Sequence, residues 1–364
     1  MEELAGFGSL GREGGLSSER PVLVDRFLEE AVEVDVDSVR DHTGDIVIGG
    51  VMEHVEEAGV HSGDSACSIP PHSLSDQTVE VIEDYTRRIA EALEVQGLLN
   101  VQFAVKDGGS GRDMVFVIEA NPRASRTVPF VAKATGVPLV KVASRVMVGA
   151  TLAELRSEGM LGEPAIPNRC GQGGHVAVKE AVLPFNRFPD ADQVLGPEMR
   201  STGEVMGIDR TFGLAFAKAQ VAAGERLPEK GGVFFSLADR DKPQGRTAAR
   251  SFVDQGFEII ATAGTADDFD AAGVPVAVRV AKLSDDEDGP TAVDLIEAGD
   301  IALVVNCPRG RGPRADGDYI RTAAAAHRIP LLTTAAAAVA AAEGIRDRDR
   351  MDRRVRSLQS YLAT

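Results

Sequence analysis

The chain has 364 residues, of which 43% are apolar and 26% charged, a composition typical of globular proteins and unlike that of disordered ones. Its 56 acidic residues outnumber its 39 basic residues, and the resulting net charge of −17 argues against nucleic acid or an anionic membrane as a bulk partner. No apolar run reaches the roughly 18 residues of a membrane span. Three widely spaced cysteines form neither a disulfide framework nor a Cys-x-x-Cys metal motif, so we expect a cytoplasmic protein.

After an irregular segment at residues 1–20, apolar and polar residues alternate with regular periods. Strict alternation at residues 32–37 (VEVDVD) predicts a half-buried strand with all its acidic side chains on one face. Taken singly, each of these carboxylates is expected to be solvated. An apolar run at 45–52 predicts the partner strand, and residues 56–68 the loop after it. Ser75 and apolar residues spaced three and four apart predict a helix over residues 75–96.

Residues 99–105 and 114–120 alternate like two strands, and the Gly-rich segment at 106–113 predicts a hairpin loop between them. Helical periodicity returns at 131–158, with a turn at 136–138. The Gly/Pro-rich segment at 161–174 reads as a linker, and the residues up to 227 mix a strand, proline turns and an Ala-rich helix.

A second domain is predicted from residue 227 onward. Apolar strands alternate there with helices, which predicts a parallel, doubly wound sheet. The Ala run at 335–342 is expected to be a terminal helix. The expected strands are 232–238, 258–262, 274–280, 300–306 and 329–333, and the expected helices include 247–255 and 266–272.

The most informative constellation for chemistry is the predicted hairpin. Residues two apart in a strand share a face, so Glu119 and Asn121 point the same way, with Gln102 opposite them if the hairpin closes. One carboxylate and two amide oxygens are hard ligands that suit Mg²⁺ or Mn²⁺. Arg123 follows directly and can contact a phosphoryl group. Taken alone, Glu-x-Asn-Pro at a strand end is also a common turn.

Longer motifs give this hairpin a context. The chain resembles the carbamoyl-phosphate synthase large chain from about residue 21 to 224, and more loosely its terminal regulatory domain of the methylglyoxal-synthase-like type from 227 to 364. The motifs that carry the resemblance are EHVEEAGVHSGDSAC (53–67), NVQFAVK (100–106), NPRASRTVPF (121–130), PFNRFP (184–189) and LGPEMRSTGEVMG (195–207).

The resemblance implies an ATP-grasp fold, which places the C-terminal part of that domain at 21–160, a connecting segment at 161–226 and the regulatory domain at 227–364. It implies transfer of the ATP γ-phosphoryl group to carbamate, giving carbamoyl phosphate for arginine and pyrimidine synthesis, with a glutaminase small chain as partner of the complete large chain. Positioning and charge neutralisation are what phosphoryl transfer mainly requires. The resemblance implies that the divalent ions are bound by Gln102, Glu119 and Asn121, with Gln102 and Glu119 also contacting ATP. It implies that Arg123 contacts the transferring phosphate and that Glu33 binds the ribose. The remaining nucleotide contacts that it implies are Arg26 and Leu28 at adenine, and Gly59, Val60, His61 and Ser62 in the loop beside the nucleotide.

The resemblance also implies two effector sites. One would bind ornithine through His54, Glu56, Asp64 and Glu180, although a solvated loop is an equally good reading of these residues. The other would bind a nucleotide in the last domain through Thr262, Thr265, Lys282 and Asn306. A helix start with threonine hydroxyls suits an anion, but a plain strand–helix turn also fits, and CPRGR (307–311) departs from the family pattern.

Nothing before residue 21 provides the Lys or Arg and the Gly-rich loop that an ATP-grasp unit places on the nucleotide phosphates. We therefore expect this chain to be the C-terminal portion of a large subunit and to have little carbamoyl-phosphate-forming activity alone. The alternative is an inactive truncated chain that acts as a nucleotide-binding regulatory module.

Overall fold

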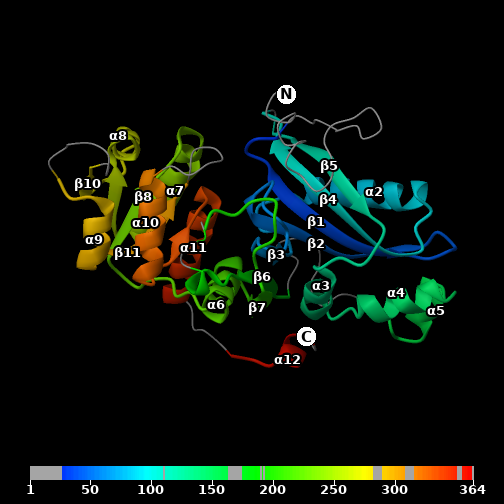
Figure 1. Cartoon of the computed structure of the whole chain (residues 1–364). Helices are drawn as coiled ribbons and strands as arrows, with labels where there is room; N and C mark the ends of the chain where they lie inside the picture. The colour runs from blue at the N-terminus through cyan, green and yellow to red at the C-terminus, as the bar shows by residue number, and fades with distance from the viewer. Residues whose placement is uncertain are drawn as a thin grey trace, which may run out of the picture.

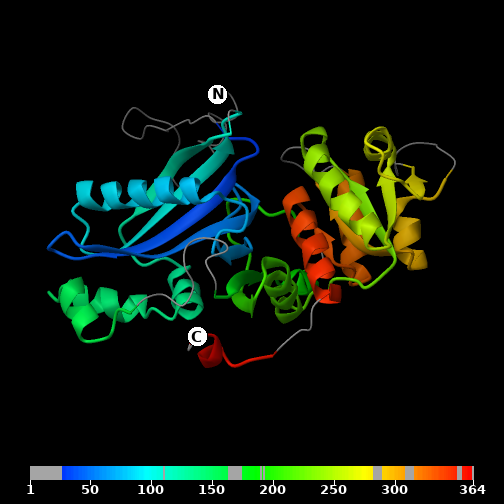
Figure 2. The same ribbon diagram turned by 180° about the vertical axis from the view of Figure 1, so that it is seen from behind.

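The computed structural model describes residues 27–109, 111–162, 174–188, 191, 193–281, 289–307, 315–350 and 355–362. They form an antiparallel sheet of seven strands and a parallel sheet of five. The two sheets belong to separate halves that lie side by side in both ribbon views (Figures 1 and 2). The expected fold class, a mixed chain with a doubly wound second domain, is confirmed. Two expected site residues, Arg26 and Lys282, lie outside the described residues.

The first sheet has the strand order β5-β4-β1-β2-β3-β6-β7, and every neighbouring pair is antiparallel. The predicted alternation is present in β1, where Val34 and Val36 enter the core beneath α2 and the acidic residues face the other way. The strands are β1 (Val32–Arg40), β2 (Ile46–Glu57), β3 (Cys67–Ile69), β4 (Gly97–Asp107), β5 (Asp113–Asn121), β6 (Val176–Val182) and β7 (Gly203–Asp209).

Helices cover both faces of this sheet (Figure 1). On one face lies α2 (Asp76–Ala92), whose first turn is capped by Ser75 as predicted. The other face carries α3 (Val128–Thr135), α4 (Leu139–Met147) and α5 (Leu152–Ser157). The helical stretch expected at 131–158 is therefore interrupted twice, at the predicted turn and again at 148–151. Left-handed Gly136 (φ 77°) and Gly149 (φ 102°) stand at these two breaks.

The second half is a doubly wound parallel sheet with the order β10-β9-β8-β11-β12. The chain moves outward through β9 and β10 and then returns to the other side of β8, so the order reverses between β8 and β11. The elements are β8 (Gly232–Ser236), η2 (Asp239–Asp241), α7 (Lys242–Asp254), β9 (Glu258–Thr262), α8 (Ala263–Ala271), β10 (Val278–Val280), α9 (Ala292–Ala298), β11 (Ile301–Asn306), α10 (Ala315–Ala326), β12 (Leu331–Leu332) and α11 (Ala335–Arg350). Helix α12 (Leu358–Leu362) follows them in the chain but packs on the first half.

Several predicted boundaries in this half were wrong. Helix α7 starts five residues early because Pro243 fits the first helical turn. Helix α8 starts at Ala263 and not at 266, so Thr265 is helical. Strands β10 and β12, the two edge strands of this sheet, are shorter than the apolar runs that predicted them. The Ala run is helical as expected, within α11.

The two halves share a continuous core. Helix α6 (Phe212–Ala223) packs on β6 and β7 and also on α11, which in turn packs on α7. One apolar cluster accordingly includes Val178 of the first sheet, Phe216 of α6 and Phe235 of the second sheet. The remaining short helix η1 spans Phe185–Arg187. At the C-terminal end, Tyr361 of α12 is buried in the core of the first half. Among the described helices, none is both long and apolar enough to cross a bilayer.

Candidate functional site

The acidic side chains of β1 are buried, so the expectation of a solvated face was wrong. Asp35 and Asp37 are each 1% exposed and Glu33 is 9% exposed. Their shared face is the one on which α3 and α4 pack, and burial there depends on helices almost a hundred residues further along the chain. Buried carboxylates need hydrogen bonds or counter-charges, and each of these three has them.

Asp37 is held by three side chains from two distant segments. The hydroxyls of Ser125 and Thr127 donate to its carboxylate at 2.7 Å each, and the amide of Asn100 donates at 3.0 Å. Burial nevertheless outweighs these bonds and raises the pKa of Asp37 to about 6. Asp37 thereby anchors the segment after β5, which carries the two arginines described below.

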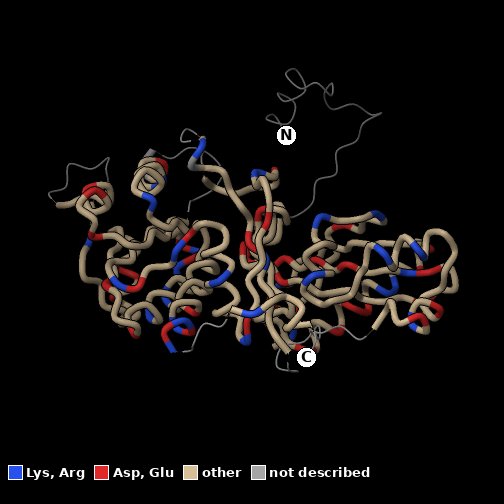
Figure 3. Tube along the Cα trace, turned by 90° about the horizontal axis from the view of Figure 1, so that it is seen from below, with Lys and Arg blue, Asp and Glu red and all other residues tan. Residues whose placement is uncertain are grey.

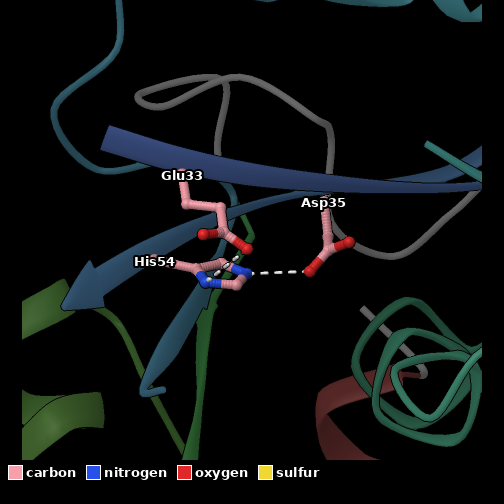
Figure 4. A group of neighbouring side chains, drawn as sticks. All are labelled: Glu33, Asp35 and His54. Atoms are coloured by element: carbon pink, nitrogen blue, oxygen red, sulfur yellow. Dashed lines mark hydrogen bonds and ion pairs between the residues drawn. The ribbon is translucent and has the colours of Figure 1, made fainter. Parts of the chain in front are cut away.

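Glu33, Asp35 and His54 form a compact buried cluster on β1 and β2 (Figure 4). His54 Nε2 lies 2.9 Å from Asp35 Oδ2, and its Nδ1 lies 3.9 Å from Glu33 Oε1. The other oxygen of Glu33 accepts a hydrogen bond from the backbone N–H of Gly59 at 3.1 Å. Glu33 thus links β1 to the 59–62 segment.

Burial and neighbouring groups shift the pKa of each member of this cluster. Burial alone lowers the pKa of His54, but Cys67 and Asp35 beside it outweigh burial and raise that pKa well above its usual value. Burial alone raises the pKa of Asp35, yet bonds from His54 and Asn100 bring it below its usual value. Burial also raises the pKa of Glu33. The three ligand atoms lie within 4.8 Å of one another, a spacing that a cation also fits, although the His54–Asp35 bond already satisfies two of the groups.

Gln102, Glu119 and Asn121 come together as the hairpin predicted. Gln102 pairs with Glu119 in the β4–β5 register, and Asn100 pairs with Asn121. Asn121 Nδ2 donates to Glu119 Oε1 at 2.7 Å. All three side chains line one cavity of about 930 Å³. A carboxylate and two amides in one wall are a donor set that fits Mg²⁺ or Mn²⁺.

Three further segments contribute to the cavity wall. Arg123 and Arg126 follow β5, residues 59–62 lie in the turn after β2, and Leu28 precedes β1. The exposed Phe27 adds a second apolar side chain beside Leu28. The guanidinium groups of Arg123 and Arg126 make one part of the cavity wall cationic, and the carboxylate of Glu119 makes another part anionic. Phe27 and Leu28 form an apolar part that suits a flat ring.

The residues expected to bind ornithine are placed in two groups. Glu56 and Glu180 are close together: burial, followed by the charge of Glu56, raises the pKa of Glu180 to about 8. The amide of Gln220 donates to Glu180 at 2.6 Å, and the backbone N–H of Ala66 donates to Glu56 at 2.6 Å. The buried Lys179 donates to the carbonyl oxygens of residues 62 and 65.

The other two members of that set have different partners. Asp64 accepts the backbone N–H groups of Arg200 and Ser201 at 2.7 and 2.8 Å, and it is 1% exposed. His54 is bonded to Asp35, which lines the 930 Å³ cavity. His54, Asp64 and Glu180 are buried and Glu56 is partly buried, which differs from the solvated loop that the sequence also allowed.

In the second half, the expected effector residues lie at the C-terminal ends of parallel strands, where the strand order reverses. Open α/β sheets usually bind ligands at this point. Thr265 Oγ1 accepts from Leu237 N at 3.1 Å and from the Thr262 hydroxyl at 3.2 Å. Asn306 accepts from Arg321 at 2.9 Å, and both are buried.

Sequence reasoning missed several residues of these sites. The sequence identified Asp35 and Asp37 only as members of an acidic strand face. It included Ser125 and Thr127 only within the motif at residues 121–130, with no role of their own. Arg321 lies on a helix with no local signal for a site. The alternation of β1 was the one available clue to the acids. The contacts of the others depend on tertiary packing.

Comparison with known proteins gives two family matches. Residues 10–155 match the model described as "Carbamoyl-phosphate synthase L chain, ATP binding domain", and residues 246–333 match the "MGS-like domain".

Curated relatives named carbamoyl phosphate synthase large chain align over nearly the whole chain. The one from Nostoc sp. is 50% identical over 94% of this chain and 30% of its own length. The one from Rubrobacter xylanophilus is 52% identical over 95% and 31%. The chain therefore spans about a third of the length of these relatives. Among solved structures, a biotin carboxylase domain of a single-chain bacterial carboxylase aligns at 16% identity and a TM-score of 0.41, covering 54% of this chain and 48% of that one.

Proposed function

We propose that this chain, which is homologous to carbamoyl phosphate synthase large chains, is the C-terminal portion of such a large chain. We also propose that the cavity of its first half binds ATP. In this proposal the γ-phosphoryl group passes from ATP to carbamate, giving carbamoyl phosphate for arginine and pyrimidine synthesis. The observation that supports it most is the meeting of Gln102, Glu119 and Asn121 in one wall of a cavity that also contains Arg123.

Each wall of the cavity has a task in this chemistry. Glu33, fixed by the N–H of Gly59, would accept hydrogen bonds from the ribose hydroxyls. Leu28 would contact the base. Arg123 would donate to the phosphoryl oxygens as their charge redistributes. Mg²⁺ or Mn²⁺ bound by Gln102, Glu119 and Asn121 would neutralise phosphate charge.

The proposal also includes two effector sites and a partner protein of the complete large chain. The parallel-sheet half would bind an anionic effector at Thr262, Thr265 and Asn306, where the strand order reverses. The acids Glu56 and Glu180 suit a cationic amine such as ornithine. A glutaminase small chain would be the partner of the complete large chain.

Nucleotide binding tests the proposal directly. Isothermal titration of the chain with ATP in excess Mg²⁺ should show one site, and Glu119→Gln should weaken it at least about tenfold, as loss of a charged ligand to a bound ion predicts. The matched control is Glu91→Gln, an exposed acid on α2 on the opposite face of the sheet. Equal affinity in Glu119→Gln and the unchanged chain would overturn the site.

Thermal unfolding with added nucleotide, read beside this titration, separates catalytic and regulatory functions. If ATP does not bind but a nucleotide monophosphate raises the melting temperature, and Thr265→Val abolishes that rise, the chain is a regulatory module. Thr265 is the appropriate probe because its hydroxyl, on α8, accepts from the backbone N–H of Leu237 just after β8.

A further inference from the structure

A buried lysine holds the loop that forms one wall of the cavity in the first half. This β2–β3 loop comprises residues 58–66, and its first part, residues 58–62, lines the cavity. Lys179 of β6 is 1% exposed. Its Nζ donates to the carbonyl oxygen of Ser62 at 3.0 Å and to that of Ser65 at 2.6 Å. One side chain therefore ties the cavity-lining part of the loop to the buried end that leads into β3.

The segment before β7 holds the same loop through other residues. The backbone N–H of His61 donates to the carbonyl oxygen of Gly196 at 2.8 Å, and the hydroxyl of Ser201 donates to that of Gly63 at 2.9 Å. Asp64 accepts from the backbone N–H groups of residues 200 and 201. These contacts engage residues 61, 63 and 64, whereas Lys179 engages residues 62 and 65. The two sets alternate along the loop and together determine its path.

The surroundings of Lys179 suit an ammonium group. An ammonium has three donors and no acceptor, so its burial requires oxygen atoms around it. Burial raises the pKa of Glu56 and, with the charge of Glu56, that of Glu180, and the charge of Lys179 opposes both shifts. Acidic positions also gather where the halves meet (Figure 3). A neutral apolar side chain at position 179 would leave two carbonyl oxygens without this donor and two acids without this cation.

We propose that Lys179 is a positioning residue of the nucleotide site, whose ammonium holds the backbone of the β2–β3 loop so that His61 and Ser62 line the cavity. Lys179 itself does not line the cavity, so it acts through the loop and not by contact with a nucleotide. A loop that is already ordered loses less conformational entropy when a ligand binds, which strengthens binding. This inference rests on the proposed function for its effect on ATP, but not for the order of the loop.

Hydrogen exchange measured by mass spectrometry tests the order of the loop without any ligand. The backbone N–H groups of residues 61, 63, 64 and 66 all donate hydrogen bonds and report on it. Lys179→Met has a similar length but no donor, and it should lower the protection of these amides at least about tenfold. Lys179→Arg retains the charge and the donors, so it should retain most of the protection.

Lys218→Met is the matched control. Lys218 Nζ also donates to a backbone carbonyl oxygen, that of Ile208 at 2.9 Å, and lies 2.7 Å from Asp209 Oδ2. Its loss should lower the overall stability without changing the protection of the β2–β3 loop. Isothermal titration with Mg²⁺ and ATP adds the functional readout, in which Lys179→Met should raise the dissociation constant at least about fivefold and Lys218→Met should not change it.

Two results would overturn the role of Lys179: loop protection in Lys179→Met equal to that of the unchanged chain, or an equal loss of loop protection in Lys218→Met. If Lys179→Met does not fold, Lys179→Gln takes its place, because it retains one amide group with a shorter reach, and the same two results decide. If the unchanged chain does not bind ATP while the exchange results hold, the nucleotide site is wrong and the positioning of the loop stands.

Discussion

Replacing Asp37 by asparagine measures how much the burial of this carboxylate lowers the free energy of unfolding. The pKa of Asp37 is raised from 3.8 to about 6. A difference of about 2 units corresponds to about 3 kcal/mol, and no discount for solvent applies to a side chain that is 1% exposed. Because the folded-state pKa lies above the unfolded one, the neutral acid contributes stability that is complete below about pH 4 and is lost as the pH rises through 6.

Asp37→Asn keeps the shape and remains neutral at every pH. With the amide oxygen at the Oδ1 position, Ser125 and Asn100 can still donate to it, and the amide N–H at the Oδ2 position can donate to the Thr127 hydroxyl. We therefore expect the free energy of unfolding of Asp37→Asn, relative to the unchanged chain, to increase by about 3 kcal/mol between pH 4 and pH 7. The gain comes from removing the ionised form and not from new contacts.

Urea unfolding followed by circular dichroism from pH 4.0 to 7.5 gives this difference. Multidomain chains need not unfold in one step, so the transition to analyse is the one that Phe103→Ala shifts, since Phe103 lies in the first-half core. Asp84→Asn, with a side chain 62% exposed on α2, serves as the control and should show no such trend. The argument is refuted if the free energies of unfolding of Asp37→Asn and the unchanged chain differ by the same amount, within about 1 kcal/mol, from pH 4.0 to 7.5.

Three further outcomes are expected. Phe103→Ala should lower the free energy of unfolding by about 3–5 kcal/mol in the same urea experiment, because it empties a fully buried site. Gly207→Ala should cost at least about 2 kcal/mol, since its Cβ would lie 2.0 Å from the carbonyl oxygen of Ala215, while Gly203→Ala on the same strand meets nothing and should be nearly neutral. Glu180→Gln should raise the melting temperature relative to the unchanged chain at pH 9 more than at pH 5, because the stability of its neutral carboxyl is lost as pH rises from 4.5 through about 8; an equal shift at both pH values would contradict this.

Local patterns predicted much of the fold and part of the site. The period of two in β1, the cap at Ser75 and the alternation of strands with helices after residue 227 are all present, because each depends on neighbours along the chain. The Gln102–Glu119 pairing was also predictable, since a short Gly-rich loop determines which residues of a hairpin face each other. The boundaries of β10 and α7 were not, because pairing partners and a proline decide them.

What the amino-acid sequence determined by itself is the side of each strand on which a residue lies, and hence that Glu33, Asp35 and Asp37 share a face. Whether that face meets water or protein was decided only when α3 and α4 packed against it, and burial is what raises the pKa of Asp37 and orders His54 between two carboxylates. Hydrophobic periodicity acts over a few residues, whereas the desolvation of a charge depends on everything that surrounds it.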